Sequence, residues 1–174
     1  LFSAAAETTS LAVQLCYYHG MVGFHSSQWL TEAGALLDQM SGVSCEAGIT
    51  QIGRVLRHAL NAGSASQPIR ALIFVGDACE EAPKPLLSLA GQCGIKKLPL
   101  FLFQEGNDAT TRAVFERMAQ VSGGATVPCD ASSVDRLSQL LGAVARVARG
   151  GLKALRDSGA AGDRLLLEQL EKGP

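Results

Sequence analysis

The chain has 174 residues, of which 47% are hydrophobic and 18% charged, and its formal net charge is −1. This composition fits one globular domain with a sizeable core, or a domain with a short appendage, and excludes a wholly disordered chain. The small net charge gives no support for binding nucleic acid or an acidic membrane, and the apolar runs are too short to span a bilayer.

The first half of the chain predicts a hairpin followed by helices. We expect these elements in order: the end of a helix over 1–9, a strand over 11–18, a turn over 19–23, and a return strand over 21–25. A helix follows that starts at Ser26 or Ser27 and ends at Gly42, then a loop over 44–48, a helix that opens at Thr50, and a linker over 61–68. His58 is expected on the solvated side of the second of these helices.

The second half alternates strands and helices. The elements we expect are a strand over 71–75, a helix from Pro83 or Pro85 to Gly94, a strand over 98–103, and a helix from Asp108 to Gly123. A short edge strand over 125–127, a capping box at 132–135, a long helix broken at Gly150–Gly151 and a helical tail complete the chain. The unbroken apolar run at 71–75 is typical of a strand buried on both faces.

This alternation predicts an α/β fold with a mostly parallel central sheet, helices on both faces and right-handed crossovers, as in Rossmann-like proteins. The return strand would add one antiparallel strand at the edge of that sheet. We divide the chain into an α/β domain, residues 1–150, and a C-terminal helical tail, residues 151–174.

The cysteines and the N-terminus bear on location. Five cysteines are scattered through the chain, and no pair has CxxC spacing, which favours reduced thiols in a cytoplasmic protein over a zinc site or a redox pair. Leu1–Ala6 contains neither the charged region of a signal peptide nor an initiating Met, so we expect the sequence to begin inside a longer gene product.

Several catalytic motifs are absent from the sequence. It contains no glycine-rich phosphate loop, no GxSxG and no HExxH, so nucleotide binding, α/β-hydrolase activity and HExxH-type zinc chemistry lose their main support. We interpret His19, His25 and His58 as turn and surface residues. Cys79 has no histidine placed in sequence to activate it, which favours a buried, inert thiol.

Two oxygen ligands remain as candidates for a metal site. Thr50 precedes a helix after a glycine-containing loop, and Asp77 follows the buried strand, where open α/β sheets bind ligands. A hydroxyl and a carboxylate suit Mg²⁺, with Mn²⁺ or Ca²⁺ as alternatives. The local pattern alone favours a simpler interpretation, in which Thr50 is a helix N-cap and Asp77 caps the segment after its strand. Glu80 and Glu81 are either a second acidic shell or partners of the next helix dipole.

Three segments together resemble a von Willebrand factor A domain, also called integrin I-like. Gly48–Leu56 is similar to the family's GTxIGxAL segment, and Ala71–Asp77 to its strand ending in a metal-site aspartate. Leu98–Gly124 resembles the closing region of the family. The resemblance covers about Leu11 to Gly150, and the chain also resembles a group of uncharacterised bacterial proteins of this fold.

The sequence departs from the family at two places. No Asp-x-Ser/Thr-x-Ser occurs before Leu11, although the strand that carries it would lie between 11–18 and 71–75. We therefore expect that an N-terminal central strand is missing from this sequence; a strand supplied by a partner and a modified fold are the alternatives. Ala78 stands where the family usually has glycine.

The resemblance implies a protein–protein interaction module rather than an enzyme. In that family a metal-ion-dependent adhesion site completes its coordination with an acidic side chain of a protein partner. Thr50 would bind Mg²⁺ directly and Asp77 through water, and the loops over 45–50, 77–81 and 104–108 would form the recognition rim. The alternatives are a metal-free scaffold that associates, with itself or a partner, through the helical tail, and a Mg²⁺-dependent, phosphatase-like hydrolase that uses Asp77.

Overall fold

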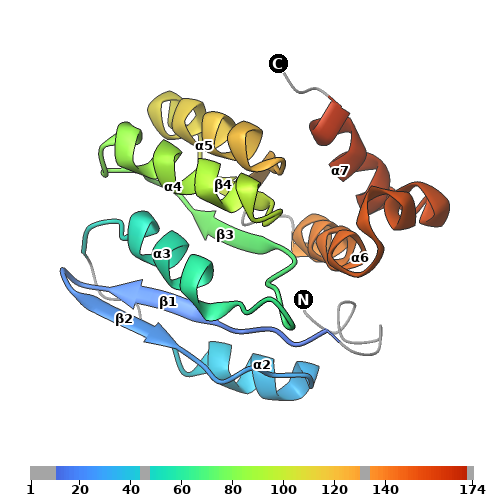
Figure 1. Cartoon of the computed structure of the whole chain (residues 1–174), viewed down its shortest axis with the longest axis horizontal. Coiled ribbons are helices and arrows are strands. Elements are labelled where there is room, and N and C mark those ends of the chain that lie inside the picture. The colour runs from blue at the N-terminus through green and yellow to red at the C-terminus, as the bar shows by residue number, and fades with distance from the viewer. Residues whose placement is uncertain (1–10, 44–47, 130–133, 172–174) are drawn as a thin grey trace.

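The computed structural model describes residues 11–43, 48–129 and 134–171 (Figure 1). Its strands are β1 (Cys16–His19), β2 (Gly23–Ser26), β3 (Leu72–Gly76), β4 (Leu100–Glu105) and β5 (Ala125–Cys129). Its helices are α2 (Ala33–Ser41), α3 (Ile52–Ala62), α4 (Pro83–Ile95), α5 (Ala109–Ser122), α6 (Val134–Ser158) and α7 (Ala161–Glu171). Within these ranges, no helix has both the length and the hydrophobicity to cross a bilayer.

The centre of the fold is a three-stranded parallel sheet in the order β3-β4-β5. Helices α3, α4 and α5 pack on one face, over a core that includes Phe74, Leu102 and Phe115. Helices α6 and α7 pack on the other face, over Phe101 and Phe103. The predicted mixed α/β class, with a parallel sheet between two helical layers, is confirmed.

The hairpin at the start of the described chain forms a sheet of its own. Strands β1 and β2 pair antiparallel, with Tyr17 opposite His25, and Gly20 turns the chain at a φ of 56°. The predicted turn and return strand are confirmed, but within the described residues the hairpin is not the edge of the parallel sheet. The expected strand over 11–18 is also shorter, because only Cys16–His19 has a ladder partner in β2.

Strand β3 is buried on one face only, whereas the sequence predicts burial on both. Leu72 and Phe74 are buried beneath α3 and α4, but Ile73 is 36% exposed and Val75 is 50% exposed. The prediction that this strand is buried on both faces is therefore wrong. The physical reason is its place at the edge of the sheet, since α6 and α7 lie over β4 and β5.

Two helices begin later than the sequence predicts. Helix α2 begins at Ala33 because Leu30 is still extended and forms a β-bridge with Val13. Helix α3 begins at Ile52, with Gln51 at its N-cap position, so the interpretation of Thr50 as the N-cap is wrong.

Helix α5 starts and ends as expected, and α4 starts as expected but runs to Ile95, one residue past its predicted end at Gly94. Helix α4 has proline in its first turn, and the side chain of Asp108 accepts a hydrogen bond from the backbone N–H of Thr111 at the start of α5. That bond lowers the pKa of Asp108 below its usual value. Gly123 ends α5 in the left-handed region, at a φ of 77°.

The helical tail is part of the second core. Gly151, at φ 65° and ψ −165°, interrupts α6 where the sequence predicts a break. Beyond it, Leu155 and Leu166 are fully buried against the sheet face that carries Phe101 and Phe103. The helix predicted over 1–9, the capping box and most of the loop over 44–48 lie outside the described residues.

Candidate functional site

The two predicted metal ligands lie in segments that the fold brings together. Thr50 precedes α3, and Asp77 occupies the bend after β3, at the carboxyl end of the sheet. Glu80 joins the segments: its backbone N–H donates to the Thr50 hydroxyl at 3.0 Å, and its Oε2 accepts from the Thr50 N–H at 2.9 Å. This double contact fixes the position of the Thr50 hydroxyl.

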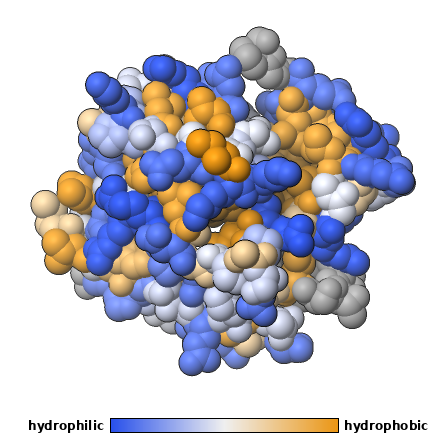
Figure 2. Space-filling view, in the orientation of Figure 1, coloured by the Kyte–Doolittle hydropathy of each residue, from blue (hydrophilic) through white to orange (hydrophobic). Residues whose placement is uncertain are grey.

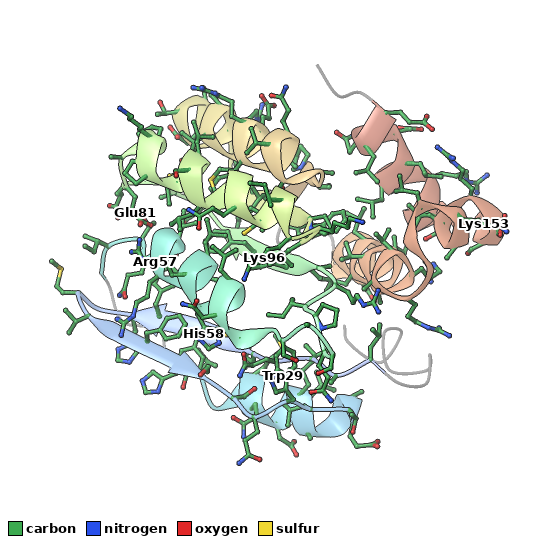
Figure 3. The ribbon with its side chains drawn as sticks, viewed as in Figure 1. Trp29, Arg57, His58, Glu81, Lys96 and Lys153 are labelled. Atoms are coloured by element: carbon green, nitrogen blue, oxygen red, sulfur yellow. The ribbon has the colours of Figure 1, made fainter. Side chains whose placement is uncertain are left out.

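Glu81 caps helix α3 from a distant part of the sequence. Its carboxylate accepts hydrogen bonds from the backbone N–H groups of Ile52 and Gly53, the latter to Oε2 at 3.0 Å. Figure 3 shows Glu81 at the first turn of α3. These N–H groups have no partner within a helix, and the positive end of the dipole favours an anion. Glu81 therefore caps α3, which corrects the expectation that its charge interacts with the dipole of the following helix.

Lys96 holds the opposite end of the same helix. Its Nζ donates to the backbone carbonyl of Leu60 at 2.9 Å, in the last turn of α3. Glu81 comes just before α4 and Lys96 just after it, so the residues that flank α4 place a negative and a positive charge at the matching ends of α3. Sequence reasoning missed both contacts, because nothing local to either residue indicates a partner about thirty residues away.

Glycines allow the close approaches around this site. A Cβ at Gly53 would lie 2.9 Å from Oε2 of Glu81, and a Cβ at Gly48 would lie 2.1 Å from the backbone oxygen of Gly20. The hairpin turn therefore rests directly on the segment that leads to Thr50. A side chain at position 48 would force this turn away from the site.

Tyr18 of β1 lies close enough to Glu81 for the carboxylate to affect its pKa. Its ring is stacked on Phe74 with 6.5 Å between centroids. Burial, with the negative charge of Glu81 second, raises the pKa of Tyr18 to about 12. The phenol therefore stays neutral near physiological pH and does not add to the negative charge of Glu80 and Glu81.

Apolar side chains are exposed beside these polar contacts. Met21 is 66% exposed, Val22 80% and Ile49 44%. Figure 2 shows apolar surface at the left edge of the molecule, where Figure 1 places the turn between β1 and β2. Arg54 holds the turn in place: its Nη1 donates to the carbonyl of Val22 at 2.7 Å, and its guanidinium lies over the ring of Phe24.

The loop over 104–108 lies next to the end of β3. Gln104 is opposite Gly76 in the ladder, and its side chain is buried. Its Nε2 donates to the carbonyl of Asp108 at 2.8 Å, and Arg112 donates to its Oε1. The amide thus closes the loop on itself and leaves Glu105 exposed.

The donor set of Thr50 and Asp77 is compatible with a hard cation. The Thr50 hydroxyl oxygen accepts one hydrogen bond and keeps a second lone pair. Asp77 is exposed, and in the described structure its carboxylate has no hydrogen bond or ion pair. Among the described residues, no three side chains of His, Cys, Asp or Glu are grouped as a metal site. Hydroxyls, backbone oxygens and water also bind hard cations, so the hypothesis of a metal at Thr50 and Asp77 stays a prediction.

The histidines and Cys79 make contacts of their own. His19 and His25 lie across the hairpin with their Nε2 atoms 3.1 Å apart. His58 is half-buried, 2.8 Å from Oε1 of Gln14 and against Phe24, so the expectation that it is solvated is wrong. The thiol of Cys79 contacts the carbonyl of Glu81, and burial raises its pKa, which supports an inert role.

Comparison of the sequence with protein-family models and with curated proteins finds no match.

Proposed function

We propose that this chain is a protein–protein interaction module of the von Willebrand factor A type. Its docking surface is the rim, defined here as Gly20–Val22, Gly48–Thr50 and Asp77–Glu81. The observation that carries the proposal is the exposure of Met21, Val22 and Ile49 on loops that hydrogen bonds and close backbone contacts hold together. Exposed apolar side chains with polar residues around them are typical of protein interfaces.

The rim is pre-organised for binding. Arg54 fixes the hairpin turn, Gly48 lies against Gly20, and Glu80 and Glu81 tie the loop after β3 to the start of α3. A surface that is already ordered loses less conformational entropy when a partner binds.

We propose further that Thr50 and Asp77 bind a divalent cation, Mg²⁺ in the first place and Mn²⁺ or Ca²⁺ as alternatives. Without a cation, the carboxylates of Asp77 and Glu80 would repel an acidic partner. A bound divalent ion reverses the local charge and attracts a carboxylate. Metal and acidic partner are therefore expected to bind together.

Calorimetric titration of the chain with MgCl₂ tests the metal proposal. We expect saturable heat for the unmodified protein and for the control Glu116→Ala, an exposed acidic residue on α5, and none for Asp77→Ala. Equal heat in Asp77→Ala, or no heat in the unmodified protein, contradicts it. Circular dichroism of each variant ensures that a loss of binding is not a loss of folding.

A short acidic peptide tests the rim itself. In two-dimensional NMR, a capped Leu-Glu-Leu peptide should shift the amides of Ile49, Thr50 and Asp77 when Mg²⁺ is present, and shift them less without it. Ile49→Lys should weaken the binding, whereas Ile95→Lys, at an apolar site that is 85% exposed at the end of α4, should leave it unchanged. Equal effects of the two substitutions would argue against the rim.

The scaffold alternative needs a different experiment from truncation. Removing residues 151–174 would delete Leu155 and Leu166 from the core, so a loss of association would only report unfolding. Leu152, in contrast, is 43% exposed after the break in α6. If the tail mediates self-association, Leu152→Glu should lower the sedimentation coefficient without lowering the melting temperature.

The state of the thiols bears on the location of the protein. Cys16, Cys79 and Cys93 are free in the structure. Free thiols persist in reducing compartments, which supports our proposal that the protein works in the cytoplasm.

A further inference from the structure

The β1–β2 hairpin brings two histidines together beside its turn. Nε2 of His19 in β1 lies 3.1 Å from Nε2 of His25 in β2, and the planes of the two rings differ by only 14°. The residues are diagonal neighbours on one face of the hairpin, because His19 is opposite Gly23 and His25 is opposite Tyr17. At this spacing the rings of diagonal neighbours can meet.

The neighbouring residues hold both imidazoles in this arrangement. A Cβ at Gly23 would lie 2.6 Å from Nε2 of His19, so the glycine leaves the space through which the His19 ring reaches across the strand pair. The ring of Tyr17 stacks on that of His25, with 5.0 Å between centroids and 17° between planes. Gly23 and Tyr17 therefore help to keep the two Nε2 atoms facing one another.

The distance between the two nitrogens suits a shared metal ion. A neutral imidazole carries its proton on either ring nitrogen, so both rings can hold a proton on Nδ1 and offer the lone pair of Nε2. Zn–N bonds of about 2.0–2.1 Å at about the tetrahedral angle place two ligand nitrogens about 3.3–3.4 Å apart. The observed separation of 3.1 Å is close to this value, and a small rotation of the rings makes up the difference.

We propose that His19 and His25 bind Zn²⁺ between their Nε2 atoms. Imidazole nitrogen is a good ligand for Zn²⁺, whereas Mg²⁺ and Ca²⁺ prefer oxygen. Since Zn²⁺ favours a tetrahedral set of ligands and His25 is exposed, water fills the positions that the two imidazoles leave. The bound ion would link the two ends of the turn Gly20–Val22. Neither Thr50 nor Asp77 belongs to this site, so either metal proposal can fail without the other.

Titration of the protein, without a histidine tag, with ZnCl₂ in competition with a chromophoric chelator tests the site. His19→Ala and His25→Ala should each weaken Zn²⁺ binding roughly tenfold or more, because the second imidazole no longer acts at a high effective concentration. The double variant should bind little more weakly than either single variant. The control Gln28→Ala, at an exposed position after β2, should bind like the unmodified protein. Absence of binding, equal binding in His25→Ala, or losses that simply add would overturn the proposal.

Nuclear magnetic resonance of the imidazole nitrogens identifies the ligand atoms. The ¹⁵N signals of Nε2 in His19 and His25 should shift together and saturate at the same ratio of Zn²⁺ to protein. His58, whose Nε2 is 2.8 Å from Oε1 of Gln14, should not shift, and MgCl₂ should leave both hairpin histidines unchanged. Gly23→Ala keeps both imidazoles but displaces the His19 ring, so it should weaken binding roughly tenfold. An unshifted His19, or full affinity in Gly23→Ala, contradicts the shared site.

Discussion

Glu81 and Lys96, the residues that flank α4, bind opposite ends of the neighbouring helix α3. The carboxylate of Glu81 accepts from the first turn, and the ammonium group of Lys96 donates to the carbonyl of Leu60 in the last. Each charge has the sign that the helix dipole favours at that end. Thr50 directly precedes the N-cap residue of α3, so this pair of contacts also helps to position the proposed site.

Glu81→Gln should destabilise the protein by about 1–2 kcal/mol, because hydrogen bonds to a charged group are stronger than those to a neutral one. Urea denaturation measures the change. Glu80→Gln is the matched control, since Glu80 is exposed and accepts only from Thr50, and it should cost less. A larger loss in Glu80→Gln would contradict the assignment of Glu81 as the cap.

Lys96→Met should cost about 0.5 kcal/mol, since a single exposed charge at a helix end contributes about that much and is screened by salt. The loss should shrink at high ionic strength. In the double variant with Glu81→Gln the two losses should add, because the contacts lie at opposite ends of α3. Strong coupling would show that the two ends do not act independently.

Gly53→Ala should be less favourable in the natural sequence than in a Glu81→Ala background, by about 1 kcal/mol. Alanine favours helix over glycine, but a Cβ at this position would lie 2.9 Å from Oε2 of Glu81. Removing the carboxylate removes the conflict. A double-mutant cycle measured by thermal denaturation gives this coupling, and a value near zero would contradict the close contact.

Arg146→Met should cost about 3–5 kcal/mol. Two nitrogens of Arg146 in α6 donate to Oδ1 of Asp163 in α7, and Asp163 is fully buried. Removal of the arginine leaves a buried carboxylate without its charged partner. The additional change Asp163→Leu should restore much of the stability, because it removes that unpaired charge. If the double variant is no more stable than Arg146→Met, the carboxylate is not the cause.

Tyr18→Phe should reduce the loss of stability at high pH. The pKa of Tyr18 is raised from 10 to about 12, so the folded state holds the phenolic proton more tightly than the unfolded state does. The stabilising contribution is complete below pH 10 and is lost as pH rises toward 12. Denaturation between pH 9 and 12 should therefore show a shallower decline for Tyr18→Phe. Parallel declines would exclude this phenol as the source.

The sequence predicts those elements whose signals are local. Pro83 at the start of α4, the Asp108 cap and the left-handed Gly123 are all where the pattern puts them, since each acts within a turn or two. The prediction fails where a distant segment decides. Thr50 does not cap α3, because Glu81 from the loop before α4 does so. Val75 is exposed because α6 and α7, which cover its face of the sheet over β4 and β5, do not extend over β3.

The candidate site was predictable in part for the same reason. Asp77 follows an apolar run, and Thr50 follows a glycine-containing loop, which is visible in the sequence. The sequence does not show that the hairpin turn lies next to them, because the contact between Gly20 and Gly48 depends on how β1 and β2 fold back. The exposed Met21 and Val22 thus become part of the rim only in three dimensions.

The position of Leu155 and Leu166 in the second core bears on how the chain folds during synthesis. Phe101 and Phe103 leave the ribosome about fifty residues before Leu155, and Leu166 follows later still. Until then, one face of the nascent sheet lacks part of its helical cover. Exposed hydrophobic surfaces of this kind aggregate or bind chaperones. Helices α6 and α7 therefore complete the cover of this sheet face, so a ribosome stalled before residue 166 would hold a sheet with one side open to solvent.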